Sequence, residues 1–162
     1  MKIVFFDCDE TLWTSADKDY ISSINSSLKK IDEKTLIREK DGKEFVLNKS
    51  VRKALEELKN KNILIGIVSD NEKQMVLKAL KIFEIYEYFD EDLINIKLWE
   101  GYCSKDEMIL ESLSKLSKKI LSKNIYWFDD KDYSKEGKEI GINFVKVQPE
   151  MNFTKSIKQL QI

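Results

Sequence analysis

Five short apolar runs of β-forming residues alternate with helical patterns along this chain, and this alternation limits the possible folds more than any other feature. Apolar strands that are separated by helices are typical of a parallel sheet buried on both faces. The sequence therefore predicts an α/β fold, a three-layer sandwich around a five-stranded parallel sheet. The predicted strands are Lys2–Asp7, Ile63–Ser69, Ile94–Leu98, Ile125–Asp129 and Phe144–Val147.

Helices are predicted between these strands because apolar residues recur there at the spacing of one helix face. The predicted helices are Ser50–Asn60, Glu72–Phe83, Ser104–Leu121, Tyr133–Ile140 and Phe153–Leu160. Two sets of residues carry the pattern: Val51, Ala54, Leu55 and Leu58 in the first helix, and Met108, Leu110, Leu113 and Leu116 in the third.

The segment from Leu12 to Asn48 departs from this alternation. A β-hairpin with a two-residue Asp41-Gly42 turn is predicted for Thr35–Leu47, because two β-forming runs flank a turn dipeptide. A short amphipathic helix is predicted before the hairpin, with its apolar face at Tyr20, Ile24, Leu28 and Ile31. The segment is too small for an independent domain, so residues 1–162 are expected to form one domain with either a small flap or an inert insertion.

The charge balance bears on partners and location. The 28 basic and 29 acidic residues give a net charge of −1 and are interleaved, so there is no electrostatic case for nucleic acid or an anionic membrane as a partner. The N-terminal apolar run is too short for a secretory signal, and no apolar stretch approaches the ~20 residues of a membrane span. We therefore expect a cytoplasmic protein, and the sequence leaves its oligomeric state open.

The chain contains no histidine and two cysteines, Cys8 and Cys103, that lie far apart. The lack of histidine excludes Ser-His-Asp and Cys-His nucleophile chemistry and every histidine-based metal site. The cysteines form no metal-binding or redox motif, and Cys8 is interpreted as a buried filler. Acid–base chemistry must therefore come from carboxylates or lysines. The three tryptophans are interpreted as packing residues: Trp13, Trp99 and Trp127.

The first predicted strand ends in the acidic run Asp7-Cys8-Asp9-Glu10-Thr11. Carboxylates at positions i and i+2 repel each other unless a cation or a shared proton lies between them. A Mg²⁺ site that also supplies a nucleophile needs such a pair, whereas acids that only cap the next element do not. Asp7 and Asp9 are therefore the first candidates for a catalytic and metal-binding site.

Polar residues also follow other predicted strands, where a parallel sheet binds its ligands beyond the carboxyl ends of the strands. Taken singly, Ser69 is explained as a helix cap, Lys105 as a solvated lysine, and Asp129-Asp130 as loop acids. Asp132 is interpreted as a cap of the next helix. Because all these polar residues are expected at the same edge of the sheet, a shared site is favoured. We assign it to Ser69-Asp70, Ser104-Lys105 and Asp129-Asp130.

Taken in order, these residues resemble the four motifs of the haloacid dehalogenase (HAD) superfamily of phosphotransferases. The first motif is matched by Asp7-Cys8-Asp9-Glu10-Thr11, the second by Ser69, the third by Lys105 and the fourth by Asp129-Asp130. The run Thr11-Leu12-Trp13 and the hairpin are similar to the capless magnesium-dependent phosphatase subfamily. The resemblance implies a HAD-like, Rossmann-like fold without a separate cap domain.

The resemblance also implies a role for each acid. Asp7 would be the nucleophile that forms an aspartyl-phosphate, and Asp9 would protonate the leaving alcohol and then activate water. Mg²⁺ would be held by the Asp7 carboxylate, the Asp9 main-chain carbonyl and Asp129. Asp130 would bind the metal through a water molecule or would support the residues that bind it.

The phosphoryl oxygens would be held by Ser69 and Lys105, with Asp70 beside them. Asp70 departs from the subfamily, which typically carries Ser-Arg at this point, and an acid there would weaken anion binding. Lys97 is a rival for the third motif, but Lys105 stands at the predicted start of a helix, whose positive end favours anions.

The sequence therefore predicts a Mg²⁺-dependent phosphomonoesterase, a hydrolase that acts on an exposed phosphate ester. Its substrate would be a phosphorylated small molecule such as a sugar phosphate, or a phosphoprotein with phosphotyrosine-type esters. The alternative is a catalytically weak phosphate-binding or regulatory module on the same fold. A nucleic-acid end phosphatase would need a more basic surface, and a dehalogenase would need neither the metal nor Asp9.

Overall fold

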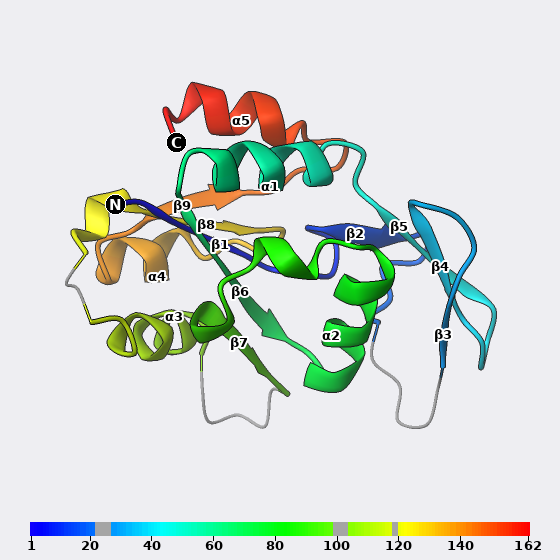
Figure 1. Cartoon of the computed structure of the whole chain (residues 1–162). Helices are drawn as coiled ribbons and strands as arrows, with labels where there is room; N and C mark the ends of the chain where they lie inside the picture. Colours follow the sequence, from blue (N-terminus) through cyan, green and yellow to red (C-terminus); the bar gives the residue numbers. More distant parts are fainter. Residues whose placement is uncertain (22–26, 99–103, 118–119) are drawn as a thin grey trace.

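A parallel sheet forms the centre of the molecule in the computed structural model, which describes residues 1–21, 27–98, 104–117 and 120–162 (Figure 1). Its strands are β1 (Ile3–Phe6), β6 (Leu64–Asp70), β7 (Ile94–Lys97), β8 (Ile125–Asp129) and β9 (Asn143–Lys146). They lie in the order β7-β6-β1-β8-β9, and every neighbouring pair is parallel. The predicted α/β fold and its five-stranded parallel sheet are confirmed.

Strand β1 is buried on both faces, because helices cover the sheet from both sides. Val4 and Phe6 point into a larger apolar cluster, whereas Ile3 and Phe5 point into a second, smaller one. The ring of Phe5 lies over Gly66 of β6, where an added Cβ would stand 2.5 Å from the ring carbon Cε1. Glycine at this point therefore lets the two central strands pair without a clash.

Within the described residues, five α-helices surround the sheet: α1 (Val51–Asn60), α2 (Lys73–Ile82), α3 (Lys105–Ser114), α4 (Ser134–Glu139) and α5 (Phe153–Gln159). Three short 3-10 turns accompany them: η1 (Tyr86–Tyr88), η2 (Glu91–Leu93) and η3 (Ser122–Asn124). Helices α1 and α5 lie on one face of the sheet, and α3 and α4 on the other (Figure 1). The predicted face of the first helix is buried, at Val51, Ala54, Leu55 and Leu58. No helix among the described residues has the length and apolar character that crossing a bilayer requires.

The third helix is shorter than predicted. Helix α3 ends at Ser114 rather than at Leu121, and Leu110 is exposed instead of facing the core. The hydroxyls of Ser112 and Ser114 donate to main-chain carbonyls of the preceding turn, at 3.0 and 2.6 Å. Serine side chains compete in this way for the helical backbone, which weakens the end of the helix. The face toward the sheet is set by Met108 and its neighbours, so Leu110 points outward.

The segment from Leu12 to Asn48 forms a second, antiparallel sheet that is larger than the predicted hairpin. Its strands are β2 (Trp13–Ser15), β3 (Leu28–Lys30), β4 (Thr35–Arg38) and β5 (Lys43–Leu47), in the order β2-β5-β4-β3. The sheet lies beyond the carboxyl end of β1 (Figure 1). The predicted helix is wrong at Leu28, which pairs with Arg38 in a strand, because pairing with β4 overrides the short helical pattern. Ile24, Trp99 and Cys103 lie outside the described residues.

The predicted hairpin forms, but its two-residue turn is wrong. Arg38 pairs with Lys43, so that residues 39–42 form a four-residue loop. The carboxylate of Asp41 accepts hydrogen bonds from the guanidinium of Arg38, at 3.0 Å from Nε and 2.7 Å from Nη2, and the loop bends around this contact. Gly42 closes the loop with a left-handed backbone, φ +73°, which favours glycine.

Candidate functional site

The carboxyl ends of the central strands surround a cleft of about 140 Å³. Most of the residues that the sequence assigns to a site line this cleft, namely Asp7, Asp9, Ser69, Asp70, Lys105 and Asp130. Of the other two, Asp129 is buried beside them against Lys105, and Ser104 is the exposed N-cap residue of α3. The other lining residues are Glu10, Lys18, Tyr20 and Lys131. Residues from β1, β6, β8 and α3 therefore meet in one place.

A buried lysine lies between two carboxylates at the bottom of this site. The Nζ atom of Lys105 is 2.9 Å from Oδ1 of Asp7 and 2.7 Å from Oδ2 of Asp129. Burial lowers the pKa of Lys105, but the charges of Asp7 and Asp129 outweigh burial and raise this pKa overall. Burial and the charge of Asp7 raise the pKa of Asp129 to about 7. Lys105 is therefore a permanent positive charge between the carboxyl groups of Asp7 and Asp129.

The carboxylates beside Lys105 offer ligands for a divalent cation. Asp7, Asp129 and Asp130 each present one oxygen, and these oxygens lie within 4.8 Å of one another. Burial and the charge of Asp7 also raise the pKa of Asp130, so the acids destabilise one another's charge. One lysine does not balance three carboxylates, and carboxylate oxygens are the ligands that Mg²⁺ prefers. The donor set therefore fits a Mg²⁺ ion.

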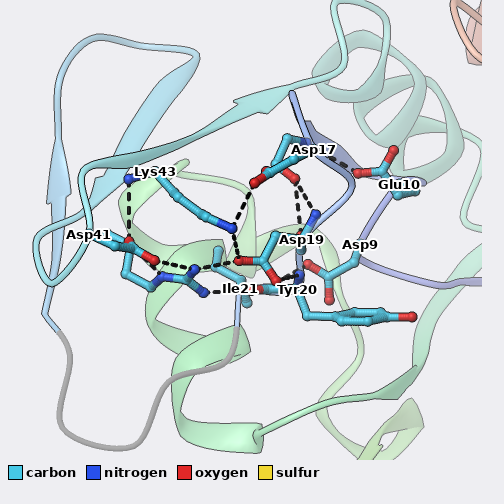
Figure 2. Close-up of polar contacts among 10 residues, drawn as sticks. Asp9, Glu10, Asp17, Asp19, Tyr20, Ile21, Asp41 and Lys43 are labelled. Carbon is cyan, nitrogen blue, oxygen red and sulfur yellow. Dashed lines mark hydrogen bonds and ion pairs between the residues drawn. The ribbon is translucent and has the colours of Figure 1, made fainter.

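The side chain of Asp9 lies in a different environment from that of Asp7. Its Oδ1 accepts hydrogen bonds from Trp13 Nε1 at 2.9 Å and from the Ile21 main-chain N–H at 3.0 Å, and its Oδ2 accepts one from Asn71 Nδ2. Burial and the charge of Asp7 raise the pKa of Asp9 to about 7, although the three donors oppose this rise. Figure 2 shows Asp9 directed toward the loop that carries Tyr20 and Ile21. Two neighbouring acids with different surroundings suit two different chemical roles.

Strand β6 brings Ser69 and Asp70 to the cleft. The interpretation of Ser69 as a helix cap is wrong, because Ser69 lies inside the strand and α2 begins only at Lys73. Ser69 is buried, and Asp70 is half-buried beside it. The next residue, Asn71, accepts a hydrogen bond from the Glu72 main-chain N–H at 2.6 Å and turns its amide toward Asp9.

Lys105 is the first residue of α3 and lines the cleft, whereas Lys97 does not. The start of α3 is fixed by a capping box, in which the Ser104 main-chain N–H donates to Glu107 Oε2 at 2.9 Å. Lys97 instead forms an exposed ion pair with Glu111. The interpretation of Lys105 as a solvated lysine is wrong, since its side chain is 5% exposed.

Sequence reasoning missed the hydrogen-bond donors that hold the acids. Trp13 and Trp127 are buried packing residues, as predicted, but their indoles also donate to Asp9 and to Asp129, the latter at 3.3 Å. The position of Trp127 two residues before Asp129 on a strand was an available signal, because such residues share a face. The main-chain N–H of Ile21 has no sequence signal.

Two smaller predictions can be compared with the structure. Asp132 Oδ1 accepts a hydrogen bond from the Ser134 N–H at 3.0 Å, but the N-cap position of α4 is Tyr133, so Asp132 lies one residue before the predicted capping position. Cys8 is completely buried, and burial together with the charges of Asp7 and Asp9 raises the pKa of its thiol. Cys8 is therefore a filler and not a nucleophile.

The sequence matches a known protein family over nearly its whole length. The family model described as Acid Phosphatase covers residues 1–161. No curated protein sequence matches the chain.

Several solved structures are similar in fold. An uncharacterized protein from Listeria monocytogenes serotype 4b is 18% identical, with a TM-score of 0.68 over 99% of both chains. A HAD-superfamily hydrolase of subfamily IA, variant 1, from Geobacter sulfurreducens PCA is 13% identical, with a TM-score of 0.61 over 98% of this chain and 99% of that one. A HAD-superfamily hydrolase from Ehrlichia chaffeensis is 22% identical, with a TM-score of 0.57 over 73% of this chain and 60% of that one. The fold is that of the HAD-superfamily hydrolases.

Proposed function

The chain belongs to the acid phosphatase family, and from this premise we propose that it is a Mg²⁺-dependent phosphomonoesterase that works through an aspartyl-phosphate. The observation that carries the proposal is the contrast between two acids of one cleft. Asp7 lies against the ammonium of Lys105, whereas Asp9 is held by uncharged donors. One acid is thus prepared to act as a carboxylate and the other to carry a proton.

In the first step, a carboxylate oxygen of Asp7 attacks the phosphorus of the ester. The new P–O bond forms as the bond from phosphorus to the leaving oxygen breaks, and the leaving oxygen takes a proton from Asp9. The products are the free alcohol, an aspartyl-phosphate on Asp7 and an ionised Asp9. Splitting the displacement in this way lowers the barrier of each part.

In the second step, water attacks the phosphorus of the aspartyl-phosphate. Asp9 takes one proton from this water, and the bond between phosphorus and the Asp7 oxygen breaks. Inorganic phosphate leaves, Asp7 is again a carboxylate and Asp9 is again protonated. A pKa of about 7 suits a residue that gives and takes the same proton in turn.

The Mg²⁺ ion would be held by the carboxylates of Asp7, Asp129 and Asp130, together with the main-chain carbonyl of Asp9. When bound, it supplies positive charge that offsets the crowded carboxylates and the phosphoryl oxygens. Ser69 and Lys105 would hold those oxygens in place. Asp70 adjoins them, and we expect its charge to weaken phosphate binding.

The cleft lies at the carboxyl ends of the strands, where parallel sheets bind ligands, and we propose an exposed phosphate ester as its substrate. Among such esters, we propose phosphotyrosine-type or sugar-phosphate substrates, and we propose a cytoplasmic location. The exposed ring of Tyr20 at the cleft is an apolar surface that a leaving group can contact. Comparing kcat/KM for phosphotyrosine and for sugar phosphates distinguishes the two substrate classes.

The direct test is hydrolysis of p-nitrophenyl phosphate with Mg²⁺ and with EDTA, for the wild type and for Asp7→Asn and Asp129→Ala. We expect hydrolysis that requires the metal, no measurable turnover in Asp7→Asn, and a higher Mg²⁺ requirement in Asp129→Ala. Asp92→Asn, an exposed acid of η2 away from the cleft, is the matched control. Thermal unfolding of each variant checks that the fold is kept.

Two outcomes would contradict the proposal. Activity retained in Asp7→Asn would reject the nucleophile. Absence of turnover with any divalent metal and with every class of ester, in a folded protein that still binds phosphate, would favour the phosphate-binding or regulatory module.

A further inference from the structure

Arg38 is a buried cation that lies outside the cleft, at the end of β4 in the antiparallel sheet. We propose that Arg38 is a positioning residue for catalysis, because it holds the loop that orients Asp9. This inference rests on the proposed function, in which Asp9 protonates the leaving group. The side chain of Arg38 is only 6% exposed, which is unusual for an arginine. A buried guanidinium needs polar partners for its N–H groups.

The guanidinium of Arg38 joins the hairpin to the loop that follows β2. Nε and Nη2 bind the two oxygens of Asp41, at 3.0 and 2.7 Å, in a forked arrangement within the hairpin. On the other side, Nη1 donates to the Tyr20 carbonyl at 2.8 Å and Nη2 binds Asp19 Oδ2. Arg38 therefore holds two consecutive residues of the loop, one through its side chain and one through its backbone.

Asp19 is the centre of this loop's hydrogen bonds, as Figure 2 shows. Its Oδ2 also accepts Lys43 Nζ at 2.7 Å, and Lys43 binds Asp17 at 2.7 Å as well. The Asp19 N–H donates to Ser15 Oγ at 2.6 Å. Residues 16–21, the part of this loop that the structure describes, form neither a helix nor a strand, so these side-chain contacts fix their path.

The backbone of this loop contacts Asp9, the proposed catalytic acid. The Tyr20 carbonyl held by Arg38 belongs to the same peptide group as the Ile21 N–H, and this N–H donates to Asp9 Oδ1 at 3.0 Å. A shift at the guanidinium therefore moves the donor that orients Asp9. Tyr20 itself lines the cleft, so the same contact also places one wall of the site.

An acid that is held out of line transfers its proton poorly, and the effect depends on the ester. A nitrophenolate leaves without help, whereas phenolate and alkoxides need a proton in the transition state. General acid catalysis is worth roughly 10²–10⁴-fold, and partial misalignment should remove about tenfold of it for poor leaving groups. A substitution that only destabilised the fold would slow the hydrolysis of all esters by the same factor.

The experiment measures kcat/KM for a series of para-substituted phenyl phosphates with Mg²⁺, and plots its logarithm against the pKa of the leaving phenol. We compare the wild type with Arg38→Met, which keeps the apolar stem, and with Asp9→Asn. The matched control is Arg52→Met, since Arg52 also donates to main-chain carbonyls, at Phe83 and Glu84, but away from the cleft. Asp19→Asn is a milder second variant if Arg38→Met does not fold.

We expect a shallow slope for the wild type and Arg52→Met, a steep slope for Asp9→Asn, and an intermediate slope for Arg38→Met or Asp19→Asn. Phenyl phosphate should lose about tenfold more activity than p-nitrophenyl phosphate in Arg38→Met. A wild-type slope in a folded Arg38→Met or Asp19→Asn protein overturns the inference alone. A wild-type slope in Asp9→Asn rejects the proposed role of Asp9, and inactivity of the wild type rejects the proposed phosphatase function.

Discussion

The two sheets of this protein contribute to one cleft in different ways. The parallel sheet supplies charges, with Asp7 after β1 and Asp129 at the end of β8. The antiparallel sheet supplies two of the three hydrogen-bond donors to Asp9, with Trp13 in β2 and the Ile21 N–H in the loop that Arg38 holds. The first region places the groups of the proposed displacement, and the second sets the state of a single acid.

This difference teaches where the effect of a mutation should be large. Charges at the strand ends are buried beside one another, so losing one leaves its partners uncompensated. Donors to Asp9 act one at a time on an acid that keeps its other donors. We therefore expect large losses in the first region, smaller ones among the donors to Asp9, and the smallest in the outer ion pairs of the antiparallel sheet.

The largest effect is expected for Lys105→Met. The substitution leaves Asp7 and Asp129 without their shared cation, so kcat/KM should fall by about 10²–10³-fold. The free energy of unfolding should fall by about 3–5 kcal/mol without metal, and Mg²⁺ should restore part of it. Kinetics and urea unfolding with and without Mg²⁺ measure both quantities. Lys97→Met removes an exposed ion pair with Glu111 and is the control; equal effects of the two substitutions would contradict the assignment.

An intermediate effect is expected for Asn71→Ala. The substitution removes one of the three donors to Asp9, so hydrolysis of phenyl phosphate should slow by about tenfold. Asn95→Ala is the control, because Asn95 is also buried and hydrogen-bonded, but to the Met108 carbonyl in α3. If the control slows turnover as much as Asn71→Ala does, the loss comes from general destabilisation and not from Asp9.

The smallest effect is expected for the contribution of Asp19 to the free energy of unfolding at acid pH. Hydrogen bonds from Lys43 and Arg38 lower the pKa of Asp19 from 3.8 to about 2 in the folded protein. A lowered pKa means that the stabilisation is complete above the unfolded value and is lost as the pH falls from about 4 toward 2. Because Asp19 is partly exposed, we expect about 1 kcal/mol or less.

The measurement is the difference in urea unfolding free energy between the wild type and Asp19→Asn across this pH range. We expect the difference to shrink as the pH falls. A difference that stays constant, or that grows in acid, would show that the Asp19 carboxylate charge does not stabilise the fold.

The sequence predicted the parallel sheet far better than the antiparallel sheet and the loop that follows β2. The ends of parallel strands share an edge in any such sheet, so Asp7, Ser69 and Asp129 were bound to meet once their strands were recognised. No comparable rule places residues 16–21, which follow β2. Their path depends on the contacts of Arg38 with Asp19 and Tyr20, which neither hydrophobic period nor turn propensity encodes.

Predictions from local sequence patterns failed where side-chain hydrogen bonds changed the course of the backbone. The Asp41-Gly42 dipeptide predicts a tight turn, but the fork between Arg38 and Asp41 widens it to four residues. The third helix ends early at Ser114, whose hydroxyl donates to a carbonyl of the last turn. Both errors come from side-chain hydrogen bonds that a pattern of apolar residues does not contain.

The contacts of Trp13 and Trp127 make the protein optically sensitive to its own site. Each indole is buried and donates to a carboxylate of the site, Trp13 to Asp9 and Trp127 to Asp129. Indole emission responds to the electric field around the ring, and that field changes when a cation or a proton reaches the acid. We therefore expect the intrinsic fluorescence of the unlabelled chain to follow occupancy of the cleft, so that metal and phosphate can be titrated without a chromogenic ester.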